Sequence, residues 1–298
     1  MKIAIVTDKS RRDFLPQEEA FKEDEQKENT AREVGKILSK KYECISLIAD
    51  DNIIHRLKEE NIDLVFNLCN DIRGDSKLAQ LPVILEFADI PYTGSSVLGH
   101  TLAINKIYSS NIFKTYDIPT PNFISVYSTD DLQDLGMKFP ILIKPNDEGS
   151  SRGIHQDSLV FDMDTLIKKV DDELKIYNPP IMLNEYIEGR EFSVGAIGND
   201  KDITVLPIQE VDLSNLPDNL MKFYSFEIKA YKALMLKDYA RVDIILEDNT
   251  PYVLEVNSLP GLMKGKSSLY RMVETIDLGY ENLVLKIVET AIKRYNFK

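Results

Sequence analysis

The stretch ARVDIILEDNTPYVLEVNSLPG, residues 240–261, contains two mostly apolar runs joined by the turn-forming letters EDNTP. Apolar runs flanking such a turn predict a β-hairpin with strands at 240–248 and 250–257. Glu255 and Asn257 interrupt the second run two residues apart, so they share one face of that strand. Burying a carboxylate without a partner is costly. The hairpin must therefore supply a partner for Glu255.

The first strand of the hairpin carries a matching polar pair, Arg241 and Asp243. If the two polar faces meet, a guanidinium, two carboxylates and a carboxamide converge. Three of these groups offer oxygen ligands, a set that suits Mg²⁺ together with substrate phosphates. A buried salt-bridge cluster of arginine, aspartate and glutamate explains the same pattern equally well. Spacing alone leaves both interpretations open.

A second segment, ILIKPNDEGSSRGI at 141–154, is a predicted strand followed by a polar loop. The strand delivers Lys144, and the loop contains Gly149, Ser150 and Ser151. Small residues let backbone N–H groups approach phosphate oxygens, and a lysine adds a point charge. The Walker A pattern is absent, and a surface turn would look similar. By itself this segment is therefore a weak indication of phosphate binding.

A third segment, MLNEYIEGREFSV at 182–194, predicts two strands and a turn, with Glu185 and Glu191 beside it. Carboxylates in such positions accept hydrogen bonds from ribose hydroxyls or an adenine amino group. Taken alone, however, the segment favours two ordinary surface carboxylates.

The rest of the chain alternates strands and helices, which predicts an α/β fold with a parallel sheet at the N-terminal end. The charged run at 18–30 predicts a solvated helix face. Strands are predicted at 2–7, 42–50 and 62–69, and helices at 17–40, 51–61, 76–90, 103–118, 129–137, 162–176 and 282–295.

Composition excludes several functional classes. The formal net charge is −13 and the isoelectric point about 4.8, so no nucleic-acid partner is expected, because such binding needs clustered positive charge. No apolar run approaches the ~20 residues of a membrane span, so no membrane partner is expected either. Cys44 and Cys69 are too few for a disulfide framework and predict core thiols in a cytoplasmic protein.

The segments IKPNDEGSS, NEYIEGREFSV, ARVDIILED and LEVNSLPG, in this order, resemble the ATP-grasp fold and more specifically the D-alanine–D-alanine ligase family. IPYTGSS at 90–96, NK at 105–106 and PTP at 119–121 match the family's central region. The resemblance implies an N-terminal Rossmann-like domain at 1–95, a central ATP-grasp subdomain at 96–180, and a C-terminal ATP-grasp subdomain with the metal site at 181–298.

The resemblance also implies roles for individual residues. The implied ATP-binding residues are Lys106 and Lys144 for the phosphates, Glu148, Gly149, Ser150 and Ser151 in a loop that closes over them, Glu185, Tyr186 and Ile187 for adenine, and Glu191 for the ribose. The implied metal ligands are Asp243, Glu255 and Asn257, which would hold two Mg²⁺ ions, or Mn²⁺ in their place. The implied catalytic groups are Arg241, Ser150 and the backbone of Gly261.

The activity implied is amide-bond formation in peptidoglycan biosynthesis, by a cytoplasmic enzyme that forms a homodimer. A carboxylate attacks the γ-phosphate of ATP to give an acylphosphate and ADP, and an amine then displaces phosphate. Amino acids or peptides would be the substrates. Alternatives are a ligase for other amino acids or peptides, an ATP-binding protein without ligase activity, and a kinase that stops at a phosphorylated product.

The sequence departs from the family where substrates bind. The family's N-terminal Ser-Glu pair has no counterpart, which leaves Glu18 or Glu19 as candidates. Only about ten residues separate Lys229, in the stretch FYSFEIKA, from Arg241, so the family's ω-loop lid is expected to be short or absent there.

The segment after the second hairpin strand also departs from the family. LMKGKSS at 262–268 shifts the serine that holds the second substrate, so Ser267 or Ser268 is the candidate. Lys264 and Lys266 add positive charge that could meet an anionic substrate group.

Overall fold

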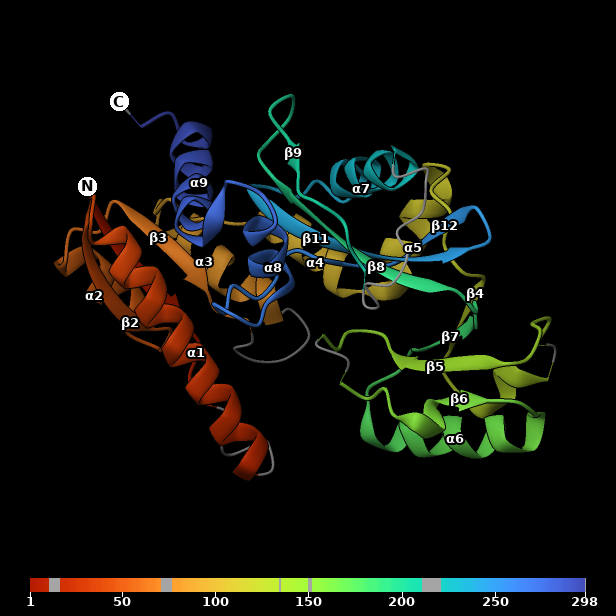
Figure 1. The fold of residues 1–298 in the computed structure, drawn as a ribbon. Coiled ribbons are helices and arrows are strands. Elements are labelled where there is room, and N and C mark those ends of the chain that lie inside the picture. Colours follow the sequence, from red (N-terminus) through yellow and green to blue (C-terminus); the bar gives the residue numbers. More distant parts are fainter. Residues whose placement is uncertain (11–16, 71–76, 134, 150–151, 211–220, 298) are drawn as a thin grey trace.

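The computed structural model describes residues 1–10, 17–70, 77–133, 135–149, 152–210 and 221–297, which form three β-sheets (Figure 1). The first sheet is parallel, with strand order β2-β1-β3, as the alternating pattern predicts. Its elements are β1 (Lys2–Thr7), α1 (Gln17–Leu38), β2 (Glu43–Ile48), α2 (Ile53–Glu59), β3 (Leu64–Leu68), the 3-10 turn η1 (Lys77–Ala79) and α3 (Gln80–Phe87).

The second sheet is antiparallel, with strand order β4-β7-β5-β6, and α6 packs on it. Leu166 and Val170 of α6 share a core with Ile143 and Leu183 of the sheet. The elements are β4 (Phe123–Val126), the 3-10 turn η2 (Thr129–Leu132), β5 (Ile141–Pro145), the 3-10 turn η3 (Gln156–Ser158), β6 (Leu159–Val160), α6 (Met163–Ile176) and β7 (Ile181–Glu185).

The position of β7 bears on the expected domain boundary at residue 180. Because β7 begins at Ile181 and lies between β4 and β5, that boundary would separate a strand from the middle of its own sheet. The sheet topology favours a boundary in the turn after Glu185 instead.

The third sheet contains the hairpin and has strand order β10-β8-β11-β12, with β9 paired to β8. Helices α4, α5 and α7 contribute to one core with this sheet, and α8 and α9 to another. The elements are α4 (Val97–Ile104), α5 (Lys106–Thr115), β8 (Arg190–Ile197), β9 (Thr204–Val205), β10 (Gln209–Glu210), α7 (Met221–Ala233), β11 (Tyr239–Glu247), β12 (Thr250–Asn257), α8 (Ser268–Glu274) and α9 (Gly279–Arg294).

Helix α9 joins the third sheet to the first. Leu283 and Ile287 of α9 lie in the same core as Ile3 of β1 and Val34 of α1. This shared core brings the N-terminal sheet and its helix α1 next to the hairpin end of the third sheet, where the site lies.

Two predicted helices differ from the structure. The helix expected at 103–118 is two helices, because Asn105 leaves the helical conformation and its side chain caps α5 by accepting a hydrogen bond from the Tyr108 amide at 2.9 Å. The helix expected at 129–137 is only the short turn η2. There, Asp131 accepts from the amides of Tyr127 and Ser128, which supports a turn rather than a longer helix.

The stretch at 223–230 lies within helix α7, which leads directly to β11. A lid would therefore have to precede this helix rather than follow Lys229, so the place at which the shortened lid was expected is wrong. Residues 211–220, just before α7, lie outside the described residues, and the shortening itself stays a prediction.

Cys69 is buried as expected, but Cys44 is only half-buried because it lies on β2, an edge strand of its sheet. The two cysteines do not form a disulfide with each other. Among the described residues, no helix is long and apolar enough to cross a lipid bilayer.

Candidate active site

The polar faces of the β11–β12 hairpin meet as the sequence predicts. Arg241 lies opposite Asn257, and Asp243 lies opposite Glu255. The Arg241 Nε and Nη2 atoms donate to the two Asp243 oxygens at 2.8 and 2.7 Å. The neighbouring strand β8 adds Ser193, whose hydroxyl donates to Asp243 Oδ1 at 2.7 Å. Four polar groups therefore converge around one carboxylate.

Both interpretations of the hairpin find support in these contacts. Arg241 and Asp243 form the ion pair of the salt-bridge alternative. Burial opposes the charged guanidinium, but Asp243 and then Glu255 outweigh this and raise the pKa of Arg241. Glu255 stands outside that pair, since its hydrogen bond within the described part of the chain is a long 3.5 Å contact from Asn257 Nδ2. Its oxygens therefore remain available for a ligand.

The donor set fits Mg²⁺ by its chemistry. Asp243 and Glu255 supply carboxylate oxygens, and Asn257, whose Nδ2 donates to Asp243 at 2.9 Å, has its amide oxygen left over. The described residues include no group of three or more His, Cys, Asp or Glu side chains suited to a metal. Two carboxylates and an amide form a partial set, as expected for Mg²⁺, which commonly completes its shell with water and substrate phosphates.

Two lysines from other elements, buried Lys106 and half-buried Lys144, lie near this hairpin. Lys144 projects from β5 and Lys106 is the first residue of α5. Burial lowers the pKa of each amine, and the carboxylate of Glu255 is the largest opposing influence on both. The structure thus brings together Lys106, Lys144 and Glu255, which are far apart in the sequence.

The loop after β5 is tied to α5. Asn146 accepts from the Lys106 amide through its backbone oxygen and from the Ile107 amide through its side chain, both at 3.0 Å. The Lys106 amine donates to the backbone oxygen of Glu148. Asn146, which is buried, therefore positions Lys106 against the loop.

The Glu148 carboxylate is engaged by two further cations. It accepts from Lys77 Nζ at 2.5 Å and lies 3.4 Å from Arg152 Nε. Gly149 lines a nearby cavity, whereas Ser150 and Ser151 lie outside the described residues.

The residues expected at the adenine lie at the turn between β7 and β8. The Glu185 carboxylate accepts from Asn122 Nδ2 at 3.0 Å and from the Lys138 amide at 3.1 Å, so it fastens two loops of its own chain. Tyr186 is exposed, and Ile187 is half-buried. Glu191 is exposed on β8 and acts electrostatically on Lys144, which places it at the lysine side of the site.

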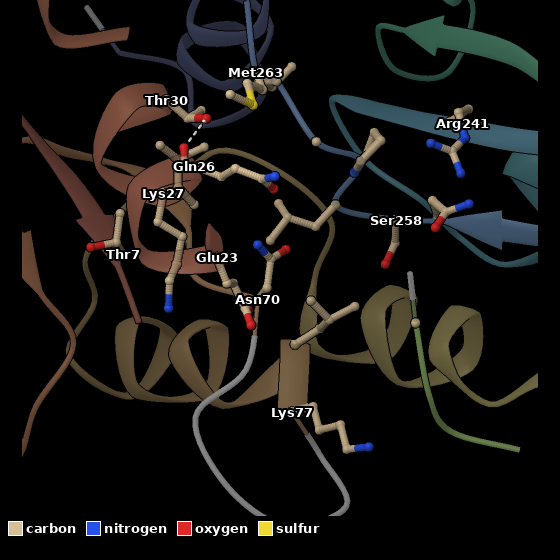
Figure 2. A pocket seen from close by; sticks show the side chains of 18 of the residues that line it. Thr7, Glu23, Gln26, Lys27, Thr30, Asn70, Lys77, Arg241, Ser258 and Met263 are labelled. Carbon is tan, nitrogen blue, oxygen red and sulfur yellow. Dashed lines mark hydrogen bonds between the residues drawn. The ribbon is translucent and has the colours of Figure 1, made fainter. Parts of the chain in front are cut away.

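A cavity of about 540 Å³ opens beside the hairpin. Figure 2 shows Arg241 and Ser258 on one side of this cavity and Thr7, Glu23 and Lys27 on the other. Of the residues assigned roles from the sequence, those that line it are Gly149, Arg241, Asn257 and Gly261. The cavity is therefore separate from the adenine and ribose candidates.

The sequence predicted that the charged run at 18–30 is a solvated helix face, but part of this run lines the cavity. Glu23, Gln26, Lys27 and Thr30 of α1 line the cavity. These residues recur at helical spacing, which places them on one polar face of the helix. This spacing is the sequence signal that could have identified them. The Lys27 amine donates to the buried carboxylate of Asp8 at 2.8 Å, so this face is held against the end of β1.

The substrate candidates Glu18 and Glu19 have side chains outside the described part of the structure. Ser267 caps α8 by accepting from the Tyr270 amide at 3.3 Å. Ser268 begins that helix, and Lys264 lies 3.8 Å from Glu33 of α1. Of the described candidates, Ser267, Ser268 and Lys264 do not line the cavity.

Sequence reasoning missed a buried pair beside the metal candidates. Ser258 follows Asn257, lines the cavity, and lies with its hydroxyl oxygen 2.8 Å from Nδ1 of His100. His100 is fully buried, and burial, assisted by the charge of Arg294, lowers its pKa to about 3. The imidazole is therefore neutral.

Comparison with known proteins identifies relatives of this chain. A family model described as the D-ala D-ala ligase C-terminus matches residues 112–229 and 222–289. A D-alanine–D-alanine ligase of Carboxydothermus hydrogenoformans is 34% identical over 286 residues, covering 85% of this chain and 88% of the relative. An uncharacterized protein of Sinorhizobium fredii is 32% identical over 263 residues, covering 78% of this chain and 75% of the relative.

A solved structure resembles the chain over its whole length. The crystal structure of a D-alanine–D-alanine ligase from Bacillus anthracis complexed with ATP has a TM-score of 0.81 at 25% identity, covering 99% of each chain. This likeness confirms the predicted α/β ATP-grasp fold with its N-terminal parallel sheet.

Proposed function

The chain belongs to the D-alanine–D-alanine ligase family, and on that premise we propose that it is an ATP-dependent ligase that joins a carboxylate to an amine. The reaction transfers the γ-phosphoryl group of ATP to a carboxylate oxygen, releasing ADP. An amine then attacks the acyl carbon and expels phosphate, which leaves an amide. Small amino acids or peptides are the proposed substrates, and the cytoplasm is the expected location.

The observation that carries this proposal is the convergence on the hairpin of two lysines from other elements. Lys106 and Lys144 both act electrostatically on Glu255, although the hairpin alone would hold only Arg241 and Asp243 together. Phosphoryl transfer requires positioning and charge neutralisation more than covalent help from side chains. A site made of lysines, an arginine and carboxylates supports that chemistry.

We propose that the ATP phosphates contact Lys106 and Lys144 and are covered by the loop that contains Glu148, Gly149, Ser150 and Ser151. Glu185, Tyr186 and Ile187 are proposed for adenine. For Glu185 the backbone is the favoured contact, because its carboxylate is already bonded to Asn122 and Lys138. Glu191, which is exposed near Lys144, is proposed for the ribose hydroxyls.

Asp243, Glu255 and Asn257 would hold Mg²⁺, whose contribution when bound is to neutralise charge on the phosphate oxygens. Arg241 has its guanidinium fixed by Asp243, so it is pre-oriented toward the cavity where the reacting carboxylate would lie. The Gly261 backbone lines the same end.

The test is a screen for phosphate release from ATP with D- and L-amino acids and dipeptides, with mass spectrometry of the products. Release of ADP and phosphate that depends on an amino acid, together with an amide product, is the expected result. ADP without free phosphate or amide would indicate the kinase alternative. Nucleotide binding with no turnover on any amino acid or dipeptide would favour the binding protein without ligase activity.

A homodimer also follows from the family resemblance and stays a prediction. Sedimentation of the purified chain measures it directly. For the domains we propose units near 1–95, 96 to the turn after Glu185, and the remainder to 298.

A further inference from the structure

The end of the cavity far from the hairpin is polar and largely uncommitted. Thr7, Lys22, Gln26 and Asn70 all line the cavity, and their side chains make no hydrogen bond or ion pair with any described residue. Lys22 lies on α1. Thr7 ends β1, Gln26 also lies on α1, and Asn70 follows β3 (Figure 2). We call these four residues the α1 end of the cavity. Polar groups gathered in this way are available to a ligand.

The positive charge at the α1 end is uncompensated in one place. Other cations that line the cavity have carboxylate neighbours: Lys27 has Asp8 at 2.8 Å, Lys77 has Glu148 at 2.5 Å, Arg152 has Glu148 at 3.4 Å and Arg241 has Asp243 at 2.7 Å. Lys22 has no such partner among the described residues.

The lining carboxylate of Glu23 does not offset this charge freely, because it already interacts within the chain. In a chain with a net charge of −13, an exposed cavity-lining lysine that has no carboxylate partner among the described residues favours an anionic ligand group at that place.

The cavity is also larger than the volume that the smallest amino acids require. Its volume of about 540 Å³ lies in the range of pockets that enclose drug-sized ligands, roughly 300–1,000 Å³. Its lining runs from Arg241 and Asn257 at the hairpin to the α1 end. A substrate whose reacting carboxylate lies at the hairpin therefore has room to extend toward Lys22.

We propose that the carboxylate donor of this ligase is an amino acid with a second, side-chain carboxylate, and that Lys22 at the α1 end binds that group. This inference rests on the proposed function and specifies the substrate class of the same site. Lys22 is then a specificity-determining residue: it contacts the part of the donor that does not react. Gln26 and Asn70 add hydrogen bonds to the same carboxylate.

The experiment compares aspartate and glutamate with glutamine and alanine as donors, each as D- and L-isomers, by amino-acid-dependent ADP release. In the wild-type chain, kcat/KM is expected to be higher for an acidic donor than for glutamine. Lys22→Glu should lower this acidic-to-amide ratio by up to about fivefold, which corresponds to the upper limit of about 1 kcal/mol for a solvent-accessible ion pair. Rising salt should reduce the ratio in the wild type, because it screens the pair.

Lys36→Glu is the matched control, since Lys36 lies on the same helix, is exposed and does not line the cavity. It should leave the ratio unchanged. Equal turnover of glutamate and glutamine, or a ratio that Lys22→Glu does not change, would overturn the proposal while leaving the ligase function intact.

A second measurement separates this proposal from the failure of the proposed function. Binding of glutamate and glutamine in the presence of Mg²⁺ and a non-hydrolysable ATP analogue is measured by calorimetry. If no amino acid supports turnover, tighter binding of glutamate that Lys22→Glu abolishes still supports the proposal. Equal binding of the two amino acids by the wild type contradicts it.

Discussion

At the scale of single residues, the candidate site combines groups that are fixed with groups that are free. Asp243 accepts bonds from Arg241, Ser193 and Asn257, so its carboxylate is held in place. Among the described residues Glu255 accepts one long hydrogen bond, so it is the carboxylate with capacity left for a ligand. The difference follows from the hairpin register and identifies Glu255 as the residue on which a metal should depend most.

Glu255→Gln should therefore abolish Mg²⁺-dependent turnover, with a loss of about 100-fold or more, and leave the fold intact. The amide keeps the shape but removes the negative charge that a divalent cation requires. Steady-state ADP release across a Mg²⁺ titration measures the effect. Glu247→Gln, at the exposed end of β11, is the control and should behave like the wild type.

His100 makes stability depend on pH. Its folded-state pKa of about 3 lies below the usual 6.5, so the unfolded chain binds the proton more readily. The free energy of unfolding should therefore fall as the pH decreases from about 6.5 toward 3, by up to about 1.4 kcal/mol per pH unit from this residue.

The measurement is urea denaturation at pH 7 and pH 5 for the wild type and for His100→Asn. The asparagine amide lies close to the place of Nδ1 and can keep the contact to Ser258, but it does not titrate. The loss of stability between the two pH values should be smaller in the variant. The same loss in both proteins would show that other groups cause it.

At the scale of elements, the site depends on how tightly the strands of the third sheet approach one another. Gly189 lies in the turn between β7 and β8, where an added Cβ would lie 2.3 Å from the backbone oxygen of Leu246 on β11. Backbone cannot yield as a flexible side chain does. This glycine is therefore required for the two sheets to meet beside the site.

Gly189→Ala should lower the free energy of unfolding by about 1–3 kcal/mol, the usual cost of overpacking. Gly261→Ala is the matched control, because its new Cβ would meet nothing within 4 Å. It should change stability by no more than about 0.5 kcal/mol. Chemical denaturation of both variants measures the contrast, and equal effects would contradict the packing argument.

At the scale of the whole molecule, Arg294 of α9 connects three distant segments. It donates to the buried carboxylate of Asp238 at 2.8 Å and to the backbone oxygens of Tyr92 and Gly94 at 2.7 and 3.2 Å. Burial raises the pKa of Asp238, while the charge of Arg294 opposes that shift. The arginine thus compensates a buried charge at the place where the N-terminal region, β11 and the C-terminal helix meet.

Arg294→Met should lower the free energy of unfolding by about 3–5 kcal/mol, because it leaves the Asp238 carboxylate buried without its cation. Adding Asp238→Asn should recover part of this loss, since the uncompensated charge is then removed. Lys293→Met, which breaks only an exposed pair with Asp202, should cost less than about 1 kcal/mol. Thermal or urea unfolding of the three variants provides the comparison.

Local patterns were sufficient for much of this protein. Alternating apolar and polar residues identified the strands. They also indicated the pairing that brings Arg241, Asp243, Glu255 and Asn257 together, because a short turn fixes the register of the two strands in a hairpin. Helix boundaries were less certain: Asn105 splits one predicted helix because its side chain replaces a backbone partner. Motifs in sequence order indicated the family and the proposed ATP side of the site.

The far side of the cavity was decided only by the tertiary structure. The contact of Lys77 with Glu148 joins residues 71 positions apart, and that of His100 with Ser258 joins residues 158 apart. The polar face of α1 was predicted to be solvated, because no local sequence pattern shows which segment a helix face packs against. Which distant segments meet depends on how three separate sheets and their helices pack, since a side chain's partners are set by the fold rather than by its neighbours in sequence.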